Sequence, residues 1–323
     1  MTKVAVLDDW QGVARSSADW TPLQRRAEVV FFDKPFAGPD DVARQLADCD
    51  IVLAMRERTA FPAGLVQRLA KLRMFGLTGA RAGSIDTEAM MARGITVCTT
   101  GGGKTGSNTA ELTLGLMLAA SRHIAAGDAA IRSGRFQEGI GAGPDLAGKT
   151  LGIIGLGRIG KLMARYGHAL GMRVLAWSQN LTPEAATAAG ATLVTKEALL
   201  QQADVVTLHL VLSDRTRGIL GAGDLARLKP GALLVNTSRG PLVDEAALIE
   251  ALQQRRIRAA LDVYDREPLP ADHPLRTLPN TVLTPHLGYT TAETFAEFYA
   301  QSIENALAFL DGKPVRVMQR RTP

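Results

Sequence analysis

Short runs of consecutive apolar residues recur along the 323-residue chain and alternate with segments whose apolar positions have helical spacing. Helical patterns lie between most of these runs, for example at Asp40–Ala47 and Glu245–Gln254. A strand that is apolar throughout is typical of a parallel sheet covered on both faces. The pattern therefore predicts an α/β protein with doubly wound parallel sheets. We predict buried strands at Val4–Leu7, Ile51–Ala54, Met74–Leu77, Leu151–Ile154, Arg173–Ala176, Val205–Leu208, Ala232–Val235 and Val282–Leu283.

Two glycine-rich segments interrupt this alternation. The first contains three consecutive glycines, Gly101–Gly103, and precedes a helical pattern that we predict to run from Asn108 to about Ser133. The second spans Gly134–Gly148 and leads directly into a strand. A chain of 323 residues is long enough for two domains. The first segment is then either an ordinary surface loop or a hinge between domains.

The composition is that of a folded protein, with 46% hydrophobic and 21% charged residues, which excludes disorder, collagen and coiled coil as the main state. Lys and Arg number 37 against 32 Asp and Glu, a net charge of +5. Spread over the surface, this charge favours solubility and is weak evidence for nucleic acid. We expect no nucleic-acid partner.

The chain has no stretch of about 18 apolar residues and no apolar amino-terminal run of signal-peptide length. We therefore expect a cytoplasmic protein without a membrane partner. Cys49 and Cys98 lie far apart, without a C-x-x-C pair or a Cys/His cluster. We expect neither a disulfide nor a metal site.

The strongest motif, G-L-G-R-I-G at residues 155–160, follows an apolar strand and precedes an amphipathic helical pattern. In that context G-x-G-x-x-G is a dinucleotide-binding fingerprint. Its first glycine permits the tight turn, the second lets the backbone approach a pyrophosphate, and the third lets the helix pack on the strand. The backbone N–H groups at the helix start would face the anion. We predict cofactor binding by Gly155, Leu156, Gly157, Arg158, Ile159 and Gly160.

The next strand ends where the adenosine ribose is expected, about 20 residues beyond the glycines. Sites for NAD usually carry Asp or Glu there, whereas this chain has Ser178, Gln179 and Asn180. Nothing at these positions repels a 2′-phosphate, and no Arg follows immediately to bind one. NAD is the favoured cofactor, and NADP stays open.

Three chemically complementary residues, Arg239, Glu267 and His286, follow the ends of successive strands. Taken singly, each has a structural explanation: a surface or capping charge, a solvated acid before a proline, and a satisfied histidine. The carboxyl ends of parallel strands line one crevice, so the three side chains converge there. Together they suit hydride transfer at an oxo acid, and we predict that they are catalytic.

Several ordered motifs resemble those of the D-isomer-specific 2-hydroxyacid dehydrogenase family, which includes glyoxylate/hydroxypyruvate reductases and phosphoglycerate dehydrogenases. They are G-L-G-R-I-G at 155–160, N-T-S-R-G at 236–240, L-D-V-Y-D-R-E-P at 261–268 and P-H-L-G at 285–288, with T-G-A-R-A-G-S-I-D at 78–86 and T-A-E at 109–111. The resemblance implies two Rossmann-like or flavodoxin-like doubly wound parallel-sheet domains with the active site in the cleft between them. It places the substrate domain at residues 1–101 and 290–323, and the dinucleotide-binding domain at 102–289. The final helical pattern, Ala292–Leu310, would return to the first domain.

The resemblance also implies an oxidoreductase that transfers hydride between NAD(P)(H) and C2 of a small 2-oxo or D-2-hydroxy acid. Arg239 would bind the substrate carboxylate and carbonyl oxygen. His286 would be the general acid/base, and Glu267 would orient it and raise its pKa.

Further roles follow from the same resemblance. Asp262 would meet the nicotinamide carboxamide, Thr237 the ribose side, and Leu210 with Val211 the adenine. Substrate binding would fall to Gly79, Ala80 and Arg81 together with Arg239, and Arg81 and Lys104 are either second-anion ligands or solvated cations. The remaining expected cofactor residues are Ser178, Thr216, Ser238, Gly288 and Thr109.

Two departures from the family pattern are the missing ribose carboxylate at Ser178 and the large Tyr289 after the histidine motif. An NAD(H)-sensing, corepressor-like binding protein with little turnover is the alternative function, by fold analogy alone. A methyltransferase would leave His286 and Glu267 without a role. The family also implies a homodimer through the long helix near Asn108.

Overall fold

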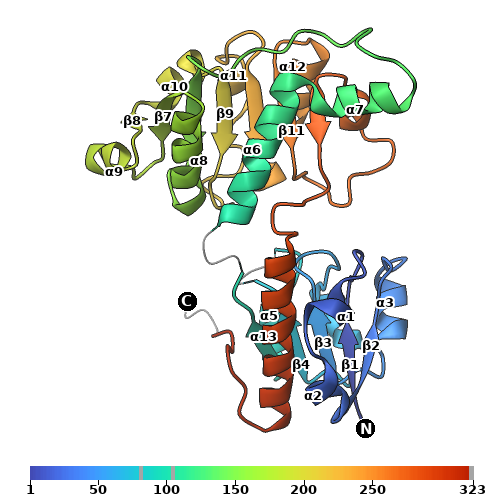
Figure 1. Cartoon of the computed structure of the whole chain (residues 1–323). Helices are drawn as coiled ribbons and strands as arrows, with labels where there is room; N and C mark the ends of the chain where they lie inside the picture. Colours follow the sequence, from blue (N-terminus) through green and yellow to red (C-terminus); the bar gives the residue numbers. More distant parts are fainter. Residues whose placement is uncertain (80–82, 103–105, 320–323) are drawn as a thin grey trace. The chain divides into compact units, whose positions relative to one another are not determined.

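The computed structural model describes residues 1–79, 83–102 and 106–319. The chain divides into two compact units (Figure 1). Unit 1 comprises Met1–Lys104 and Thr290–Pro323, and unit 2 comprises Thr105–Tyr289. Unit 1 is thus built from both ends of the chain.

The sheet of unit 1 has five parallel strands in the order β2-β1-β3-β4-β5. The order reverses between β1 and β3, as in flavodoxin-like sheets. Strands β3 and β4 are buried along their whole length, which is why their sequences are apolar throughout. The strands are β1 (Thr2–Val6), β2 (Ala27–Phe31), β3 (Ile51–Ala54), β4 (Met74–Leu77) and β5 (Thr96–Thr99).

The helix that returns from unit 2, α13 (Ala292–Leu310), completes unit 1 and confirms the predicted final helix. Thr291 caps its start by accepting a hydrogen bond from the Thr294 N–H. Its buried face includes Tyr299, whose ring centroid lies 5.8 Å from that of Trp20. The other helices of unit 1 are α1 (Ala14–Ser17), α2 (Thr21–Gln24), α3 (Pro39–Gln45), α4 (Ala63–Arg68) and α5 (Thr87–Ala92).

The glycine-rich segment after β5 runs along α13. A Cβ added to Gly101 would lie 2.6 Å from a glutamate oxygen of α13, and one on Gly102 would lie 3.0 Å from the Phe298 ring. These two glycines therefore let the chain pass close to the helix. Gly103 and Lys104, two further residues of the prediction, lie outside the described residues.

The sheet of unit 2 has seven parallel strands in the order β12-β11-β10-β9-β6-β7-β8. The order reverses between β6 and β9, which is the switch point of a Rossmann sheet and the usual place for a ligand. The predicted fold class, two doubly wound parallel sheets, is confirmed. The strands are β6 (Thr150–Ile154), β7 (Arg173–Trp177), β8 (Thr192–Leu193), β9 (Val205–Leu208), β10 (Leu233–Asn236), β11 (Arg258–Leu261) and β12 (Thr281–Leu283).

Helices cover both faces of this sheet, and α6 and α8 lie together on one face in Figure 1. That face buries Leu116, Met117 and Met163, while the opposite face buries Leu200 and Leu248. The sheet therefore has a core on each side. The helices of unit 2 are α6 (Ser107–Arg122), α7 (Ile124–Arg132), α8 (Arg158–Ala169), α9 (Pro183–Ala188), α10 (Lys196–Gln202), α11 (Ala222–Leu225) and α12 (Glu245–Gln253), with 3-10 turns η1 (Gly240–Leu242) and η2 (Pro274–Thr277).

The predicted continuous helix from Asn108 to about Ser133 is wrong. The chain breaks it at His123, whose φ of 55° is left-handed and separates α6 from α7. The Arg258 guanidinium donates to the Ala120 carbonyl oxygen at 3.1 Å and so satisfies the end of α6. Because this partner comes from β11, the local apolar period carried no sign of the break.

Both cysteines, Cys49 and Cys98, are buried free thiols. Burial raises the pKa of Cys98 to about 11, so that thiol stays protonated at neutral pH. In the part of the chain that the structure describes, no helix combines the length and the apolar character needed to cross a bilayer.

Asp8 is a fully buried acid two residues beyond β1. Its Oδ1 accepts a hydrogen bond from the Thr59 hydroxyl at 2.8 Å, whereas its buried Oδ2 has no partner among the described residues. Burial raises the pKa of Asp8 to about 6, against an ordinary 3.8, and the Thr59 bond offsets this only in part. An ionised Asp8 therefore destabilises unit 1.

We expect the free energy of unfolding of unit 1 to fall by up to about 3 kcal/mol between pH 4 and pH 7, and Asp8→Asn to abolish this fall. Between the unfolded pKa of 3.8 and the folded pKa of about 6, the folded state holds a proton that the unfolded state has lost. Stability therefore decreases as the pH rises through that window. Urea unfolding followed by tryptophan fluorescence in a Trp177→Phe background, which leaves Trp10 and Trp20 in unit 1, measures it.

The control is Asp33→Asn, which removes an exposed acid of the same unit. It should keep the pH dependence of the wild type. Equal pH dependence in the Asp8→Asn variant and the wild type would contradict the assignment.

Candidate active site

The loop between β6 and α8 has the geometry that its three glycines predict. Gly155 has a φ of +102°, and a Cβ there would lie 2.7 Å from the His209 carbonyl. A Cβ on Gly160 would lie 2.1 Å from the Gly155 oxygen. By contrast, no atom lies within 4 Å of a Cβ placed on Gly157. Two glycines are therefore fixed by packing, and the third leaves open space above the loop.

The start of α8 fits an anionic ligand. Its N-cap is Gly157, which supplies no side-chain capping bond, and its first turn carries no acid. The N–H groups of that turn and the positive end of the helix dipole are typical of a pyrophosphate site. The loop from Gly155 to Gly160 therefore fits a dinucleotide.

Ser178, at the end of β7, interacts with this loop. Its Oγ accepts a hydrogen bond from the Leu156 N–H at 3.1 Å. The hydroxyl thus braces the loop at the position where an Asp or Glu is more usual. Neither Ser178 nor the following Gln179 brings a charge to this position.

The structure brings His286 and Glu267 together as a hydrogen-bonded pair. His286 Nδ1 lies 2.6 Å from Glu267 Oε2, and the other carboxylate oxygen accepts from the Tyr264 N–H at 2.9 Å. Since Glu267 holds Nδ1, Nε2 is the ring nitrogen left for a ligand. The Tyr289 ring lies edge-to-face against the imidazole, with centroids 5.8 Å apart.

Asp262 fixes the turn that carries His286. The fully buried carboxylate accepts hydrogen bonds from the Thr284 hydroxyl at 2.6 Å and from the Leu287 and Gly288 N–H groups at 2.7 and 2.9 Å. Burial raises the pKa of Asp262, and these three donors counteract it. Its carbonyl also accepts the His286 N–H at 2.9 Å, although His286 has a left-handed φ of 55°. The turn is therefore held in a strained backbone conformation.

Threonines join α6 to the same turn. The Thr109 hydroxyl donates to the Gly288 carbonyl at 3.0 Å, and the hydroxyls of Thr113 and Thr237 lie 2.7 Å apart. Thr109, Thr237 and Gly288 were all predicted to bind the cofactor. The structure places them in one hydrogen-bonded region of unit 2.

The turn that carries Arg239 is held by its own polar groups. The Ser238 hydroxyl donates to the Leu208 carbonyl at 2.8 Å, and the Asn236 amide donates to the Arg239 carbonyl at 2.8 Å. The next residue, Gly240, packs against another loop, because a Cβ on it would lie 2.1 Å from the Tyr264 carbonyl carbon. The segments of Arg239 and Glu267 are therefore in direct contact.

The predicted adenine wall is a short loop closed by Thr216. Its Oγ donates to the Val211 carbonyl at 2.7 Å and accepts the Ser213 N–H at 2.8 Å. The Val211 side chain is 77% exposed, and Leu210 is half-buried. An exposed apolar side chain at the end of β9 is compatible with a flat aromatic ligand.

In unit 1, the predicted substrate loop is described only at its start. The Gly79 N–H donates to the Thr100 hydroxyl at 2.9 Å, so this donor is already engaged. Ala80 and Arg81 lie outside the described residues.

Two further residues lie beside the predicted groups without having been predicted. Arg56, just beyond β3, has a left-handed φ of 54°, and its Nη1 would lie 1.8 Å from a Cβ on Gly79. His209, just beyond β9, has both ring nitrogens buried without a hydrogen-bond partner among the described residues, and burial lowers its pKa to about 3. The sequence could have indicated both residues, because each lies shortly after an apolar strand.

The chain resembles known proteins along its whole length. Residues 114–288 match the family described as D-isomer specific 2-hydroxyacid dehydrogenase, NAD binding domain. A D-3-phosphoglycerate dehydrogenase of Archaeoglobus fulgidus is 38% identical over 265 residues, which cover 82% of this chain and 50% of that protein. A glyoxylate reductase of Aeropyrum pernix is 39% identical over 257 residues, covering 77% of this chain and 76% of that protein. The crystal structure of a phosphoglycerate oxidoreductase from Vibrio cholerae O395 aligns with a TM-score of 0.91 and 35% identity, covering 97% of this chain and 100% of that chain.

The chain spans about half the length of the phosphoglycerate dehydrogenases from Archaeoglobus fulgidus and Methanocaldococcus jannaschii that it matches. The matched range 114–288 lies within unit 2 and contains the glycine loop, Arg239, Glu267 and His286. Unit 2 thus matches an NAD-binding domain over most of its length.

We expect Gly160→Ala to reduce stability and Gly157→Ala to reduce NADH affinity. Gly160→Ala should destabilise unit 2 by more than about 2 kcal/mol, because its methyl group would overlap backbone. Gly157→Ala should fold like the wild type but bind NADH at least about tenfold more weakly, because its methyl group occupies the space that a pyrophosphate needs. Thermal unfolding and tryptophan-to-NADH energy transfer measure the two effects. Unaltered NADH affinity in Gly157→Ala would argue against the loop as the binding site.

Proposed function

Because the chain belongs to the D-isomer-specific 2-hydroxyacid dehydrogenase family, we propose that it transfers hydride between NAD(H) and C2 of a small 2-oxo or D-2-hydroxy acid. The observation that supports this most is the 2.6 Å contact between His286 Nδ1 and Glu267 Oε2. A histidine that acts as general acid/base needs one ring nitrogen held in place so that the other can exchange the proton, and this contact holds Nδ1.

His286 is the general acid/base of the proposed reaction. Glu267 accepts the Nδ1 proton and directs Nε2 toward the substrate oxygen. During reduction Nε2 gives a proton to the forming alkoxide, and during oxidation it takes that proton back.

Arg239 binds the substrate. Its planar guanidinium can donate two parallel hydrogen bonds to a 2-oxo acid, one to the carboxylate and one to the carbonyl oxygen. The positive charge stabilises the negative charge that develops on that oxygen. The cofactor supplies or accepts the hydride at its nicotinamide, and the protein aligns the two reacting carbons.

The cofactor is held by the groups around the switch point of unit 2. The loop from Gly155 to Gly160 would bind the pyrophosphate, Leu210 and Val211 the adenine, and Thr237 and Asp262 the nicotinamide side. Ser178 would meet the adenosine ribose. Because neither Ser178 nor Gln179 brings the positive charge that binds a 2′-phosphate, we propose NAD as the cofactor and test NADP beside it.

We further propose that unit 1 is the substrate domain. Ala80 and Arg81 would supply donors to the substrate carboxylate, and Gly79, whose N–H binds the Thr100 hydroxyl, would shape the loop beside them. The named relatives act on phosphoglycerate or glyoxylate, so both a phosphorylated and a short unsubstituted acid belong in the substrate panel.

We expect purified protein to oxidise NADH with at least one of glyoxylate, hydroxypyruvate, pyruvate and phenylpyruvate, or to reduce NAD⁺ with D-3-phosphoglycerate. Arg239→Ala and His286→Asn should lower kcat/KM by about 1,000-fold, and Glu267→Gln by about 100-fold, because each removes a group that acts in the transition state. Absorbance at the NADH band measures the rates, with NADPH and NADP⁺ run in parallel.

Arg165→Ala, which removes an exposed cation from α8, is the matched control and should keep wild-type rates. Tight NADH binding with no turnover on any acid would reject the proposal. That result would favour the NAD(H)-sensing binding protein.

We also propose that the chain forms a homodimer through α7 and the residues after it. Three large apolar side chains stand in solvent there: Ile124 is 55% exposed, Ile131 58% and Phe136 66%. Exposed apolar residues gathered on one short segment are typical of an interface. A second copy of the chain is the partner that the family resemblance implies.

We expect the wild type to sediment as a dimer and the double variant Ile131→Asp/Phe136→Asp to weaken dimerisation by at least about 100-fold, because it places charges in an apolar contact. Analytical ultracentrifugation over a concentration series measures the dissociation constant. Val315→Asp, at a 41% exposed position of unit 1, should remain dimeric. A monomeric wild type would contradict the proposal.

A further inference from the structure

The backbone of Tyr264 and Asp265 makes contacts in three directions. The Tyr264 N–H, which directly precedes the peptide between these residues, donates to Glu267 Oε1 at 2.9 Å. Gly240 packs directly on the peptide, since a Cβ there would lie 2.1 Å from the Tyr264 carbonyl carbon and 2.5 Å from the Asp265 nitrogen. The Asp265 N–H points to Glu245 Oε2 at 3.5 Å. This peptide therefore joins the segments of Arg239 and Glu267 to the start of α12.

Glu245 is itself held by a histidine. Its Oε1 lies 3.1 Å from His273 Nε2, and His273 Nδ1 accepts the Leu275 N–H at 3.3 Å. Because Nδ1 is an acceptor, Nε2 carries a proton and donates to Glu245. The carboxylate of Glu245 thus has one oxygen on the histidine and the other toward the Asp265 amide.

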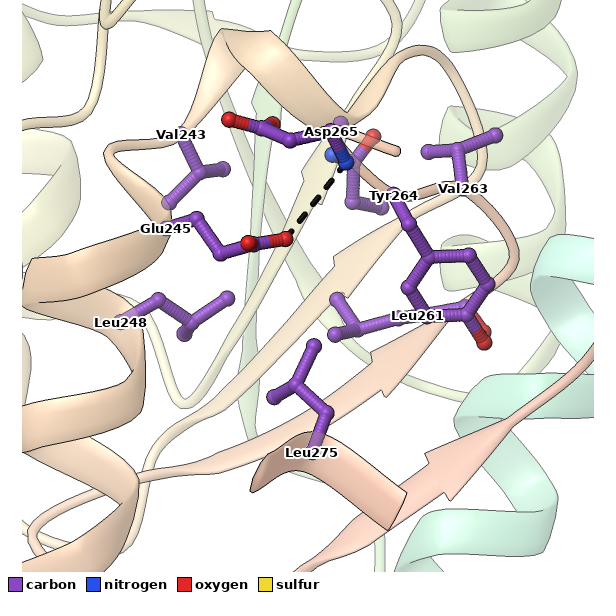
Figure 2. Close-up of a pocket in the computed structure, with 10 residues that line it drawn as sticks. Val243, Glu245, Leu248, Leu261, Val263, Tyr264, Asp265 and Leu275 are labelled. Carbon is purple, nitrogen blue, oxygen red and sulfur yellow. Dashed lines mark hydrogen bonds between the residues drawn. The ribbon is translucent and has the colours of Figure 1, made fainter. Parts of the chain in front are cut away.

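Figure 2 shows Glu245 and the Asp265 amide beside a small cavity. Glu245 points between the Asp265 amide and the apolar side chains of Leu248 and Leu275, which come from α12 and η2. The cavity is too small for an organic ligand. The side chains of His273 and Glu245 are 14% and 25% exposed, so the pair is partly shielded from solvent, whereas Asp265 is exposed.

Glu245, the partner of His273, lies near a second acid, Asp265. Burial raises the pKa of Asp265, followed by the nearby negative charge of Glu245 and a smaller effect of Asp244. The positive charge of Arg217 acts in the opposite direction. Without His273, Glu245 would face another acid with no donor of its own on the Oε1 side.

We propose that Glu245 and His273 are a positioning pair for the His286–Glu267 acid/base, an inference that rests on the proposed function. The pair fixes the Tyr264–Asp265 peptide, the Tyr264 N–H fixes Glu267, and Glu267 fixes the imidazole. A displacement of that peptide misaligns Nε2 of His286, and through Gly240 it also reaches the Arg239 segment. Neither Glu245 nor His273 touches the substrate.

Two variants and one control test the proposal. Glu245→Gln keeps the size of the side chain but removes its charge, and His273→Gln removes the ring. Each should lower kcat about tenfold to 100-fold and leave the dissociation constant of NADH within about twofold, because small misplacements of catalytic groups reduce the rate strongly. Glu250→Gln, an exposed acid on the same helix, should change neither value.

A double-mutant cycle separates positioning from general destabilisation. If Glu245 acts through Glu267, Glu245→Gln should lower kcat less than about twofold in a Glu267→Gln background. A merely structural role predicts the same loss in both backgrounds. Equal losses, or a kcat within about twofold of wild type in both single variants, would overturn the proposal.

The signal of the His286 ring gives a readout that does not need turnover. Nitrogen-15 labelling of the five histidines, with His286→Asn to assign the signal, should show the Nδ1 proton that Glu267 holds. Glu245→Gln should shift or broaden that signal, and Glu250→Gln should leave it unchanged. Absent turnover with this shift present would reject the proposed function alone, whereas an unchanged signal would reject the positioning pair.

Discussion

The parallel register of the unit 2 sheet is the constraint on which its site depends. Trp177, Ile154, Leu208, Asn236, Leu261 and Leu283 pair across neighbouring strands in a single row. The residues that directly follow this row are Ser178, Gly155, His209, Thr237, Asp262 and Thr284. A shift of one strand by one residue would turn its side chains to the other face and move its terminal group out of the row. The ladder of backbone hydrogen bonds thus decides which side chains stand at the switch point.

Beyond that row the ladder of backbone hydrogen bonds ends, and side chains bind the backbone groups of the turns instead. The Asn236 amide, the Asp262 carboxylate and the Glu267 carboxylate each bind backbone groups of a turn beyond the strand ends. Such bonds replace the partners that the strands lose at their ends. The same residues therefore shape the loops and bring polar groups to the carboxyl end of the sheet. This double use explains why so many buried polar groups of unit 2 lie within a few residues of a strand end.

The sequence predicted the strands that are buried on both faces. Strands such as β3, β4 and β9 are buried at every position, so their sequences form continuous, mostly apolar runs. By contrast, β8 has only two residues and produced no apolar run, and β2, which is mostly half-buried, was missed although it contains Val29, Val30 and Phe31. At the break between α6 and α7, the end of α6 is satisfied by Arg258, which lies more than a hundred residues away in the chain. Local periodicity contains no information on such a partner.

For the site, strand ends were predictable and side-chain partners were not. Arg239, Glu267 and His286 were found because each follows an apolar strand, and the structure pairs Glu267 with His286. Arg56 follows β3 in the same way, yet only the three-dimensional structure shows its guanidinium over Gly79. Likewise, Ser178 looked like a lost ribose ligand, whereas its hydroxyl binds the Leu156 amide. The chemistry of a residue type is visible in sequence, but its partner depends on register and turn geometry.

The two fully buried acids at strand ends show how this difference acts on stability. Asp262 has three donors, so its burial is largely compensated and its charge can be retained beside the turn of His286. Asp8 occupies a comparable place in unit 1 but has one side-chain donor and an unpartnered oxygen, and its pKa rises to about 6. The cost of an uncompensated carboxylate is therefore concentrated in unit 1, at the end of β1 beside the reversal of strand order. Unit 2, by contrast, spreads its buried charge over backbone donors that the parallel register has already brought together.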